Sequence, residues 1–377
     1  MSVKRLMVVG LGLIGGSIAL AARRADPNIH VRGVTGSAAS AGWALEHGVV
    51  DEAATADDAI AHGWFADGLT DLLIIGAPIP ATIEWLHRLP ELGYHGVVSD
   101  VASTKRAVVE AASAHEGEYL FVGGHPMAGS ERSGVQAASA ALFDSAYYIL
   151  TPTGATDSHA YRLMHAFAAS LGARVISIDA AVHDDAVAVV SHVPHVTAAA
   201  LVELARSRAD DAGADLMRLA AGGFKDSTRI AAGSPDLWTG ICLDNAAAIV
   251  AGLAEIESIL GEFRRVLEAG DADGVRHWLT GAADTRRALP AQWVPSTAQL
   301  SEFIVPVTDQ PGAVGTVATA LSRAGCNIEN IEIDHQSEAT AFLRLVLTDE
   351  GDMAGAISEL EALGYKPVLR PLEGGDD

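Results

Sequence analysis

The histidine at position 125 is the side chain of this sequence that is best placed to act as a base. It follows an apolar run, residues 119–122, and two glycines, and it begins the segment HPMAG. A strand that ends in Gly-Gly can bring both the backbone and an imidazole ring close to a ligand, and imidazole exchanges protons near neutral pH. A lone histidine is also often a hydrogen-bonded loop residue, so the elements around His125 decide between the two interpretations.

Two segments further along the chain place polar groups in alanine-rich surroundings. The first is SHVPH, residues 191–195, which follows His183 and Asp184. Its HxxH spacing could suggest a metal site. However, Pro194 interrupts the turn, and no cysteine or well-spaced carboxylate completes a ligand set, so we predict no metal.

The second segment, GGFKDSTRIA at residues 222–231, combines a glycine pair with Lys225 and Arg229. Arginine can hold a carboxylate through two parallel hydrogen bonds, so Arg229 is a candidate carboxylate clamp. An ordinary ion pair with Asp226 is the alternative at this spacing. Trp238 could form a wall of the same pocket or fill the core.

The N-terminal stretch predicts a dinucleotide-binding turn. An apolar strand over residues 5–9 is followed by Gly10, Gly12 and Gly15 in the pattern GxGxxG, and then by a helix through residue 24. The three glycines permit a tight turn, the close approach of a pyrophosphate and helix-strand packing, while the helix N-terminus faces the phosphates. A second strand over residues 29–34 completes the expected unit.

One position departs from the pattern for NAD. An acidic residue is expected near the end of the second strand, where it binds the ribose 2′-hydroxyl, but the chain has Val-Thr-Gly-Ser over residues 34–37. Thr35 and Ser37 could donate hydrogen bonds to a 2′-phosphate. No arginine follows the strand, and Arg32 lies within it. The sequence therefore leaves NAD and NADP open as the cofactor.

Further strands are expected at residues 71–76 and 96–99, each followed by a helix. In a doubly wound parallel sheet, ligands bind outside the carboxyl ends of the strands. Gly10, Pro78, Ser103 and His125 all follow such ends, so we expect them to share one edge of the sheet. Ser103 could equally be the N-cap of the helix that follows it.

Composition limits the classes of function. The chain has 377 residues, a formal net charge of −23 and 49% hydrophobic residues. No basic cluster favours nucleic acid or an anionic membrane. Cys242 and Cys326 form no CxxC or Cys/His cluster, which fits a reducing cytoplasm. The apolar run after Lys4 and Arg5 resembles a signal peptide, but the glycine pattern explains it, so we expect a cytoplasmic protein.

Three domains are expected in the α/β class. Residues 1–179 form the Rossmann-type dinucleotide-binding domain, with two more strands at 147–150 and 174–178. Residues 180–294 form an all-helical domain whose apolar helices must bury more than one face, which predicts a homodimer. After a proline-containing linker at 290–297, residues 299–371 follow a ferredoxin-like βαββαβ order.

The motifs GLGLIGGS, SDVASTK, GGHPMAGSERSG, VVSHVPH and GGFKDSTRIA together resemble the prephenate/arogenate dehydrogenase family of tyrosine biosynthesis. The resemblance implies an oxidative decarboxylation. A hydride leaves C4 of a cyclohexadienol for the nicotinamide, a ring carboxylate leaves as CO2, and the product is aromatic. Prephenate is the expected substrate, with arogenate as the alternative, because no residue here decides between the two side chains.

The resemblance also implies roles for individual residues. His125 would accept the 4-hydroxyl proton, Ser103 would bind the same hydroxyl or orient the histidine, and Arg229 would hold a substrate carboxylate. The remaining pocket residues would be Ser191, His195, Lys225 and Trp238. The cofactor would contact Gly10, Gly12, Leu13, Ile14, Gly15, Thr35, Pro78 and Ser103.

The C-terminal module resembles an ACT domain, a fold that commonly binds amino acids. The resemblance rests on a turn with Asp309, Pro311 and Gly312 before a helix, and on Gly-Cys-Asn-Ile with Asn327 before the second strand. It implies feedback by tyrosine, while a dimerisation module without a ligand is the alternative.

Two other functions fit part of the sequence. A β-hydroxyacid dehydrogenase would share the nucleotide fold and the helical domain, but it would use a lysine on a helix of the second domain and leaves HPMAG unexplained. A regulator without catalysis would not need the glycine pattern together with Ser103, His125 and Arg229. We therefore predict an oxidoreductase.

Overall fold

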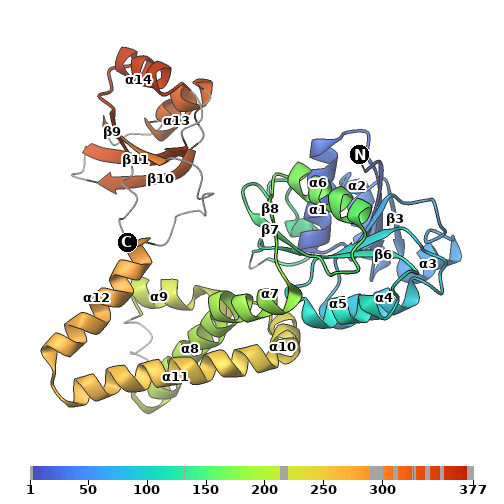
Figure 1. Cartoon of the computed structure of the whole chain (residues 1–377), viewed down its shortest axis with the longest axis horizontal. Coiled ribbons are helices and arrows are strands. Elements are labelled where there is room, and N and C mark those ends of the chain that lie inside the picture. The colour runs from blue at the N-terminus through green and yellow to red at the C-terminus, as the bar shows by residue number, and fades with distance from the viewer. Residues whose placement is uncertain are drawn as a thin grey trace. The chain divides into compact units, whose positions relative to one another are not determined.

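The computed structural model describes residues 3–130, 132–212, 220–288, 300–308, 313–324, 326, 328–335, 340–348 and 352–371. These residues form two compact units, residues 1–260 and 261–377, and the division falls within one long helix, α11 (Ala246–Glu268). Figure 1 colours the chain from blue at the N-terminus to red at the C-terminus.

The first unit is organised around an eight-stranded sheet with the order β3-β2-β1-β4-β5-β6-β7-β8. Neighbouring strands are parallel except for β6 and β7, which are antiparallel. The order in which successive strands are added to the sheet reverses between β1 and β4. A doubly wound sheet binds its ligand at this switch point. The strands are β1 (Arg5–Val9), β2 (His30–Thr35), β3 (Glu52–Thr55), β4 (Leu72–Ile75), β5 (Val97–Asp100), β6 (Leu120–Pro126), β7 (Tyr147–Thr151) and β8 (Arg174–Ser177).

Helices cover both faces of this sheet, as Figure 1 shows. One core forms beneath α1 (Leu13–Ala25), α2 (Ala38–Glu46) and α6 (Ser158–Ser170). The other forms beneath α3 (Ala56–Ala61), α4 (Ile79–Arg88) and α5 (Arg106–Ser113). The predicted Rossmann-type domain is confirmed. Strand β3 was not predicted, because its short EAAT segment lacks the apolar run of a buried parallel strand.

From residue 180 onward, the described part of the first unit is helical, as predicted. A continuous run consists of α7 (Ala180–Val187), a π-helical turn (Ala188–His192) and α8 (Val193–Ala212). The expectation that Pro194 interrupts the turn is wrong, because Pro194 is the second residue of α8. Proline has no N–H for the preceding turn, and the wider π-helical turn just before it accommodates this loss.

The remaining helices of this region are α9 (Gly222–Thr228), a 3₁₀ turn (Arg229–Ala232), α10 (Pro235–Asp244) and the first part of α11. Large apolar side chains of the helical region are exposed, including Val190 (68%) in the π-helical turn, Leu243 (74%) in α10 and Val250 (65%) in α11. An apolar groove of about 450 Å³ lies between α8 and α11, where Val193, Leu201 and Ile256 line it. Such a surface is typical of a subunit interface.

The helical run Ala180–Arg208 also has the length and composition of a membrane span, and 33% of the 18-residue apolar window within it is buried. Core and interface helices of water-soluble proteins have the same composition, so this is weak evidence for a membrane. Buried His183 and Asp184 within the run contact the sheet domain.

The second unit contains α12 (Ala272–Ala288) and a four-stranded antiparallel sheet with the order β10-β11-β9-β12. Alternate residues of β9, Phe303, Val305 and Val307, are buried beneath two helices. The βαββαβ order is therefore confirmed, with β9 (Leu300–Thr308), α13 (Ala313–Arg323), β10 (Ile328–His335), β11 (Thr340–Thr348), α14 (Met353–Ala362) and β12 (Val368–Pro371). The linker 290–297 and the predicted regulatory residues Asp309, Pro311, Gly312 and Asn327 lie outside the described residues.

Candidate functional site

The glycine turn between β1 and α1 has the shape of a phosphate cradle. Gly10 has a φ of +103°, and a Cβ at Gly15 would lie 2.0 Å from the carbonyl oxygen of Gly10. These two positions therefore require glycine. A Cβ on Gly12, by contrast, would meet no protein atom within 4 Å, so the turn leaves open space where a pyrophosphate would lie. Leu13 and Ile14 begin α1, whose first turn has no acidic residue and whose N-cap makes no side-chain hydrogen bond.

Among the described residues, no free cation lies at the end of β2. Thr35 is 8% exposed, and Arg32 is bonded to Glu52 (3.2 Å) and lies over the ring of Trp64. Ser37, which the sequence suggested as a phosphate ligand, has another role in the structure. Its hydroxyl accepts from the amide of Ser40 and donates to the Ser40 hydroxyl, so it caps α2. A 2′-phosphate would thus find no arginine from β2 at this position.

Two predicted contacts lie where the sequence placed them, after β4 and β5. Pro78 is exposed and is the N-cap of α4. Ser103 is half-buried in the loop between β5 and α5. The alternative role of Ser103 as a helix cap is not seen, because the N-cap of α5 is Lys105. The first amides of α5 are instead held by a residue of α7, Asp184.

His125, at the end of β6, is the first member of a hydrogen-bonded chain of side chains. Its Nδ1 lies 2.8 Å from Nε2 of His183, and Nδ1 of His183 lies 2.8 Å from Oδ1 of Asp184. Asp184 also accepts from the amides of Lys105 (2.7 Å) and Arg106 (2.9 Å). The chain joins β6 of the sheet domain to α7 of the helical region.

The hydrogen bonds between these side chains indicate which nitrogen carries the proton on the rings of His125 and His183. Hydrogen bonds from His183 and the two amides lower the pKa of Asp184, although burial opposes the shift, so this carboxylate only accepts. When His183 is neutral, it therefore carries its proton on Nδ1 and accepts on Nε2. His125 then donates from Nδ1, which leaves the lone pair on its Nε2. An unprotonated Nε2 is what a general base requires.

The surroundings of His125 favour its neutral form. Burial, followed by the charges that His183, Lys105 and His192 can carry, lowers the pKa of His125 well below its ordinary value. When Nε2 does take a proton, the positive charge can be shared along the chain toward Asp184. The arrangement supplies a base that is free at neutral pH and has a path for stabilising the charge it acquires.

A second set of rings adjoins this chain. The side-chain amide of Asn245 donates to the carbonyl of Asp184 (2.7 Å) and lies 3.2 Å from Nδ1 of His192. His192 contacts the edge of Trp238, and His195 stacks on the same indole with ring centroids 3.5 Å apart. Nδ1 of His195 is buried, and the described residues give it no hydrogen-bond partner.

Arg229 and Lys225 are exposed on the 3₁₀ turn and on α9. The 3₁₀ turn leads into Gly233, where a Cβ would come within 3.2 Å of both Trp238 and His195. No ion pair between Arg229 and Asp226 occurs among the described residues. Ser191 is half-buried in the π-helical turn. The structure thus places the Arg229 turn beside the His195–Trp238 pair, but gives no contact from Arg229, Lys225 or Ser191 to His125.

Sequence reasoning missed several buried polar residues of the site: Asp100, Lys105, Asp184, His192 and Asn245. His183 and Asp184 were considered only as a possible metal site. Adjacent polar residues in an apolar helix were the available signal, but their partners lie 58 to 79 residues away in the chain.

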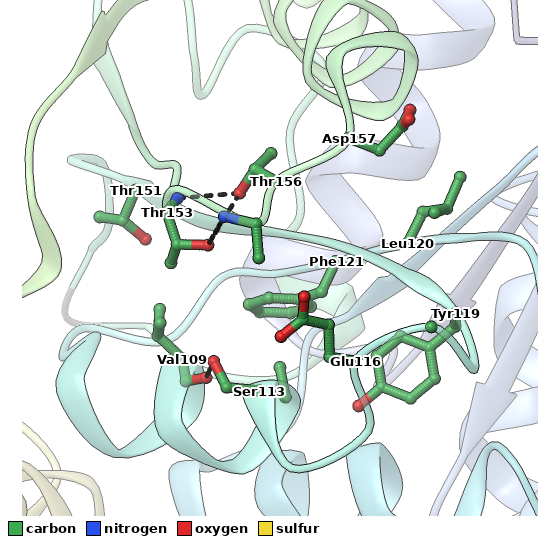
Figure 2. Close-up of a pocket in the computed structure, with 13 residues that line it drawn as sticks. Val109, Ser113, Glu116, Tyr119, Leu120, Phe121, Thr151, Thr153, Thr156 and Asp157 are labelled. Carbon is green, nitrogen blue, oxygen red and sulfur yellow. Dashed lines mark hydrogen bonds between the residues drawn. The ribbon is translucent and has the colours of Figure 1, made fainter.

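A cavity of about 310 Å³ lies away from these residues, between α5, β6 and the β7–α6 connection (Figure 2). Figure 2 shows Glu116 beside Phe121 on one side, and Thr153 and Thr156 joined by a hydrogen bond on the other. Its lining includes neither His125 nor any other predicted site residue. This cavity therefore takes no part in the site.

A dinucleotide cradle and a protected imidazole base at one edge of a doubly wound sheet define a nicotinamide-dependent dehydrogenase. Family profiles match three consecutive regions: the nucleotide-binding domain of prephenate dehydrogenase over residues 18–177, its dimerization domain over 179–281, and an ACT domain over 303–365. The chain belongs to the prephenate dehydrogenase family, and the predicted resemblance is confirmed.

Individual relatives agree with this assignment. Prephenate dehydrogenase of Bacillus subtilis is 34% identical over 95% of both chains. A crystal structure of prephenate dehydrogenase from Aquifex aeolicus, in complex with hydroxyphenyl propionate and NAD+, has a TM-score of 0.70 at 28% identity, covering 76% of this chain and 98% of that one. Arogenate dehydrogenase of Synechocystis has a TM-score of 0.63 at 30% identity, covering 75% and 99%.

Proposed function

We propose that this chain catalyses the oxidative decarboxylation of prephenate to 4-hydroxyphenylpyruvate, with hydride transfer to NAD(P). The observation that carries the proposal is the chain from Asp184 through His183 to His125, which leaves Nε2 of His125 as a lone-pair acceptor. A cyclohexadienol needs such a base for its 4-hydroxyl proton, while the bound nicotinamide supplies the hydride acceptor.

In the proposed reaction, Nε2 of His125 takes the hydroxyl proton as the hydride leaves C4. The electrons of the bond to the departing carboxylate move through the ring to the C4 oxygen, CO2 is released, and the ring becomes aromatic. The C4 oxygen takes the proton back from His125, which gives the phenol and restores the base. The buried surroundings of His125 keep it unprotonated before the reaction. Ser103, half-buried at the end of β5, would bind the same hydroxyl or orient the imidazole.

Arg229 is proposed to hold a carboxylate of the substrate. Its position on the turn beside His195 and Trp238 supports this role. Among the described residues, Arg229 forms no ion pair with Asp226 that would compete with the substrate carboxylate. His195 offers a buried, unpartnered Nδ1, and Trp238 an apolar face. Lys225 and Ser191 are proposed to complete the pocket. Arogenate remains the alternative substrate, because these residues do not distinguish its side chain from that of prephenate.

For the cofactor, we propose that NAD binds at the Gly10–Gly15 turn, in contact with Leu13, Ile14, Thr35, Pro78 and Ser103. The bound NAD+ of the Aquifex aeolicus structure and the engaged Arg32 support NAD, while the missing acidic residue keeps NADP open.

The test is an assay of four mixtures: prephenate or arogenate, each with NAD or NADP, followed by the absorbance of the reduced nicotinamide. We expect the largest kcat/KM with prephenate and NAD. A larger kcat/KM with arogenate would transfer the proposal to the alternative substrate, and no turnover in any mixture would contradict the function.

We also propose that the exposed apolar surface of α8 and α11 pairs with a second copy of the chain, since the matched family region is described as a dimerization domain. Tyrosine is proposed to act through the ACT domain as a feedback inhibitor. Free thiols at Cys242 and Cys326 support a reducing, cytoplasmic location. Light scattering, which gives the mass in solution, tests the pairing of two copies. The assay described above, repeated in the presence of tyrosine, tests feedback inhibition.

A further inference from the structure

Two fully buried charged residues, Lys105 and Asp100, form an ion pair beside the strand that carries His125. Both side chains hold the preceding residue, Gly124. Nζ of Lys105 donates to the carbonyl of Gly124 (2.8 Å), and Oδ1 of Asp100 accepts from its amide (3.0 Å). The two backbone groups of Gly124 are thus bound by side chains on this side of the strand.

These contacts replace a missing stretch of the sheet. Pairing between β5 and β6 runs from Val97 opposite Leu120 to Ser99 opposite Val122, and among the described residues no partner strand continues beyond it on this side. On its other side, β6 remains paired with β7, where Gly124 lies opposite Leu150. The ion pair therefore fixes β6 where it extends past the end of β5 and carries His125 into the site.

Gly124 fits this position without room for movement. A Cβ there would lie 2.7 Å from the carbonyl oxygen of Asp100 and 3.0 Å from the ring of Tyr148. The peptide that precedes His125 is thus enclosed by the ion pair, the end of β5 and a buried tyrosine.

Lys105 also binds the other end of the histidine chain. Its backbone amide donates to Oδ1 of Asp184, at 2.7 Å, while its ammonium holds Gly124. One residue therefore sets the spacing between the strand of His125 and the carboxylate that orients His183.

Stability alone does not explain a buried ion pair. Removing two charges from water costs free energy that their attraction often fails to recover, and apolar replacements of similar volume are often neutral or stabilising. We propose that Lys105 and Asp100 are positioning residues, which hold the Gly124 peptide so that His125 meets both His183 and the substrate. This inference rests on the proposed role of His125 as the base.

Two matched double variants test the proposal. Asp100→Asn with Lys105→Gln removes both charges but keeps an acceptor and a donor for Gly124. Asp100→Leu with Lys105→Met removes the charges and both contacts. We expect the second to lose about 10²-fold in kcat with KM within about twofold, as displacement of a reacting group by about 1 Å can do. The first should stay within about tenfold of the unchanged chain. Equal activity of the two variants, with NAD affinity retained in both, would overturn the proposal.

Gly124→Ala is the second measurement if Asp100→Leu with Lys105→Met does not fold, because it displaces the same peptide and leaves the pair intact. It should lower kcat with little change in KM, and an unchanged kcat would contradict the proposal.

The histidine ring NMR signals provide a readout that does not depend on the substrate. The signal absent from His125→Asn identifies His125. It should report the Nδ1–H tautomer in the unchanged chain and in Asp100→Asn with Lys105→Gln. In Asp100→Leu with Lys105→Met, which lacks the Gly124 contacts, we expect a mixture of the two tautomers of His125. A single Nδ1–H tautomer in this variant would overturn the positioning role. If the unchanged chain fails to oxidise prephenate or arogenate, the proposed function fails, while this NMR comparison still decides the positioning role.

Discussion

The two halves of the site are built from different parts of the polypeptide. The dinucleotide cradle consists of backbone: a left-handed Gly10, an open Gly12 and a Gly15 packed against Gly10, all within six consecutive residues. The histidine chain consists of side chains, and it joins His125 to His183 across 58 residues. The cradle therefore depends on local conformation, whereas the base depends on how two regions of the chain pack together.

This difference predicts how each half fails. A change in the cradle should affect affinity for the cofactor, because the turn has no chemical role in proton transfer. A change in the histidine chain should affect kcat, because it alters the protonation or position of one ring.

Replacement of His125 removes the proposed base itself. We expect His125→Asn to lower kcat by about 10³–10⁴-fold, since asparagine cannot take the hydroxyl proton, while NAD affinity stays unchanged. Steady-state kinetics and calorimetric titration with NAD measure the two quantities. A variant that retains kcat would show that the base lies elsewhere.

Asp184→Asn tests the assignment of protons along the chain. In this variant the amide nitrogen replaces one acceptor and faces the backbone N–H of Lys105 or Arg106, so the contact that orients His183 is weakened. With the nitrogen at the Oδ1 position it donates to Nδ1 of His183, which reverses both rings and places a proton on Nε2 of His125. We expect kcat to fall by about 10²–10³-fold, as for other histidines held in the wrong tautomer. Asp185→Asn is the control, because that neighbouring carboxylate is exposed and pairs with Arg106. Equal losses in the two variants would remove the chain from the mechanism.

Arg229→Ala separates substrate binding from both halves. Loss of a charged hydrogen bond to a carboxylate should raise KM by about 10–10²-fold and leave NAD affinity unchanged. The control is Arg162→Ala, because Arg162 is an exposed residue of α6. An unchanged KM would exclude Arg229 from the carboxylate site.

Gly12→Val tests the cradle. Its side chain would enter the space that the turn leaves open, so we expect NAD affinity to fall by at least about tenfold without loss of stability. Gly42→Ala, within α2, is the control, since its Cβ also meets no protein atom. Thermal unfolding and NAD titration decide the outcome. If NAD affinity is retained, the pyrophosphate does not approach Gly12.

The smallest effect concerns pH. Burial lowers the pKa of His192 to about 4, so the unfolded chain binds more protons than the folded chain between about pH 6.5 and 4. Stability should consequently fall as the pH is lowered through this range. Replacing His192 by glutamine should weaken the dependence of Tm on pH, whereas replacing the exposed His62 should not. An identical slope in both variants would contradict a buried neutral His192.

The sequence by itself determined the three-part architecture, the glycine turn and most strands of the sheet, because runs of apolar residues and glycine spacing express local requirements of the backbone. It also predicted His125 as the candidate base, since GGHPMAG follows a strand end. Short β3 escaped prediction because EAAT has neither the length nor the hydrophobicity of its neighbours. The linker and the predicted ACT residues stay predictions.

Only the tertiary structure decided which polar residues act together. Asp184 caps α5 from another helix, and Lys105 joins Gly124 to that carboxylate. The sequence contains each residue but no periodic pattern that pairs them. Hydrogen bonds between distant segments arise only when burial removes water and forces each polar group to find a partner, and that selection depends on packing across the whole first unit.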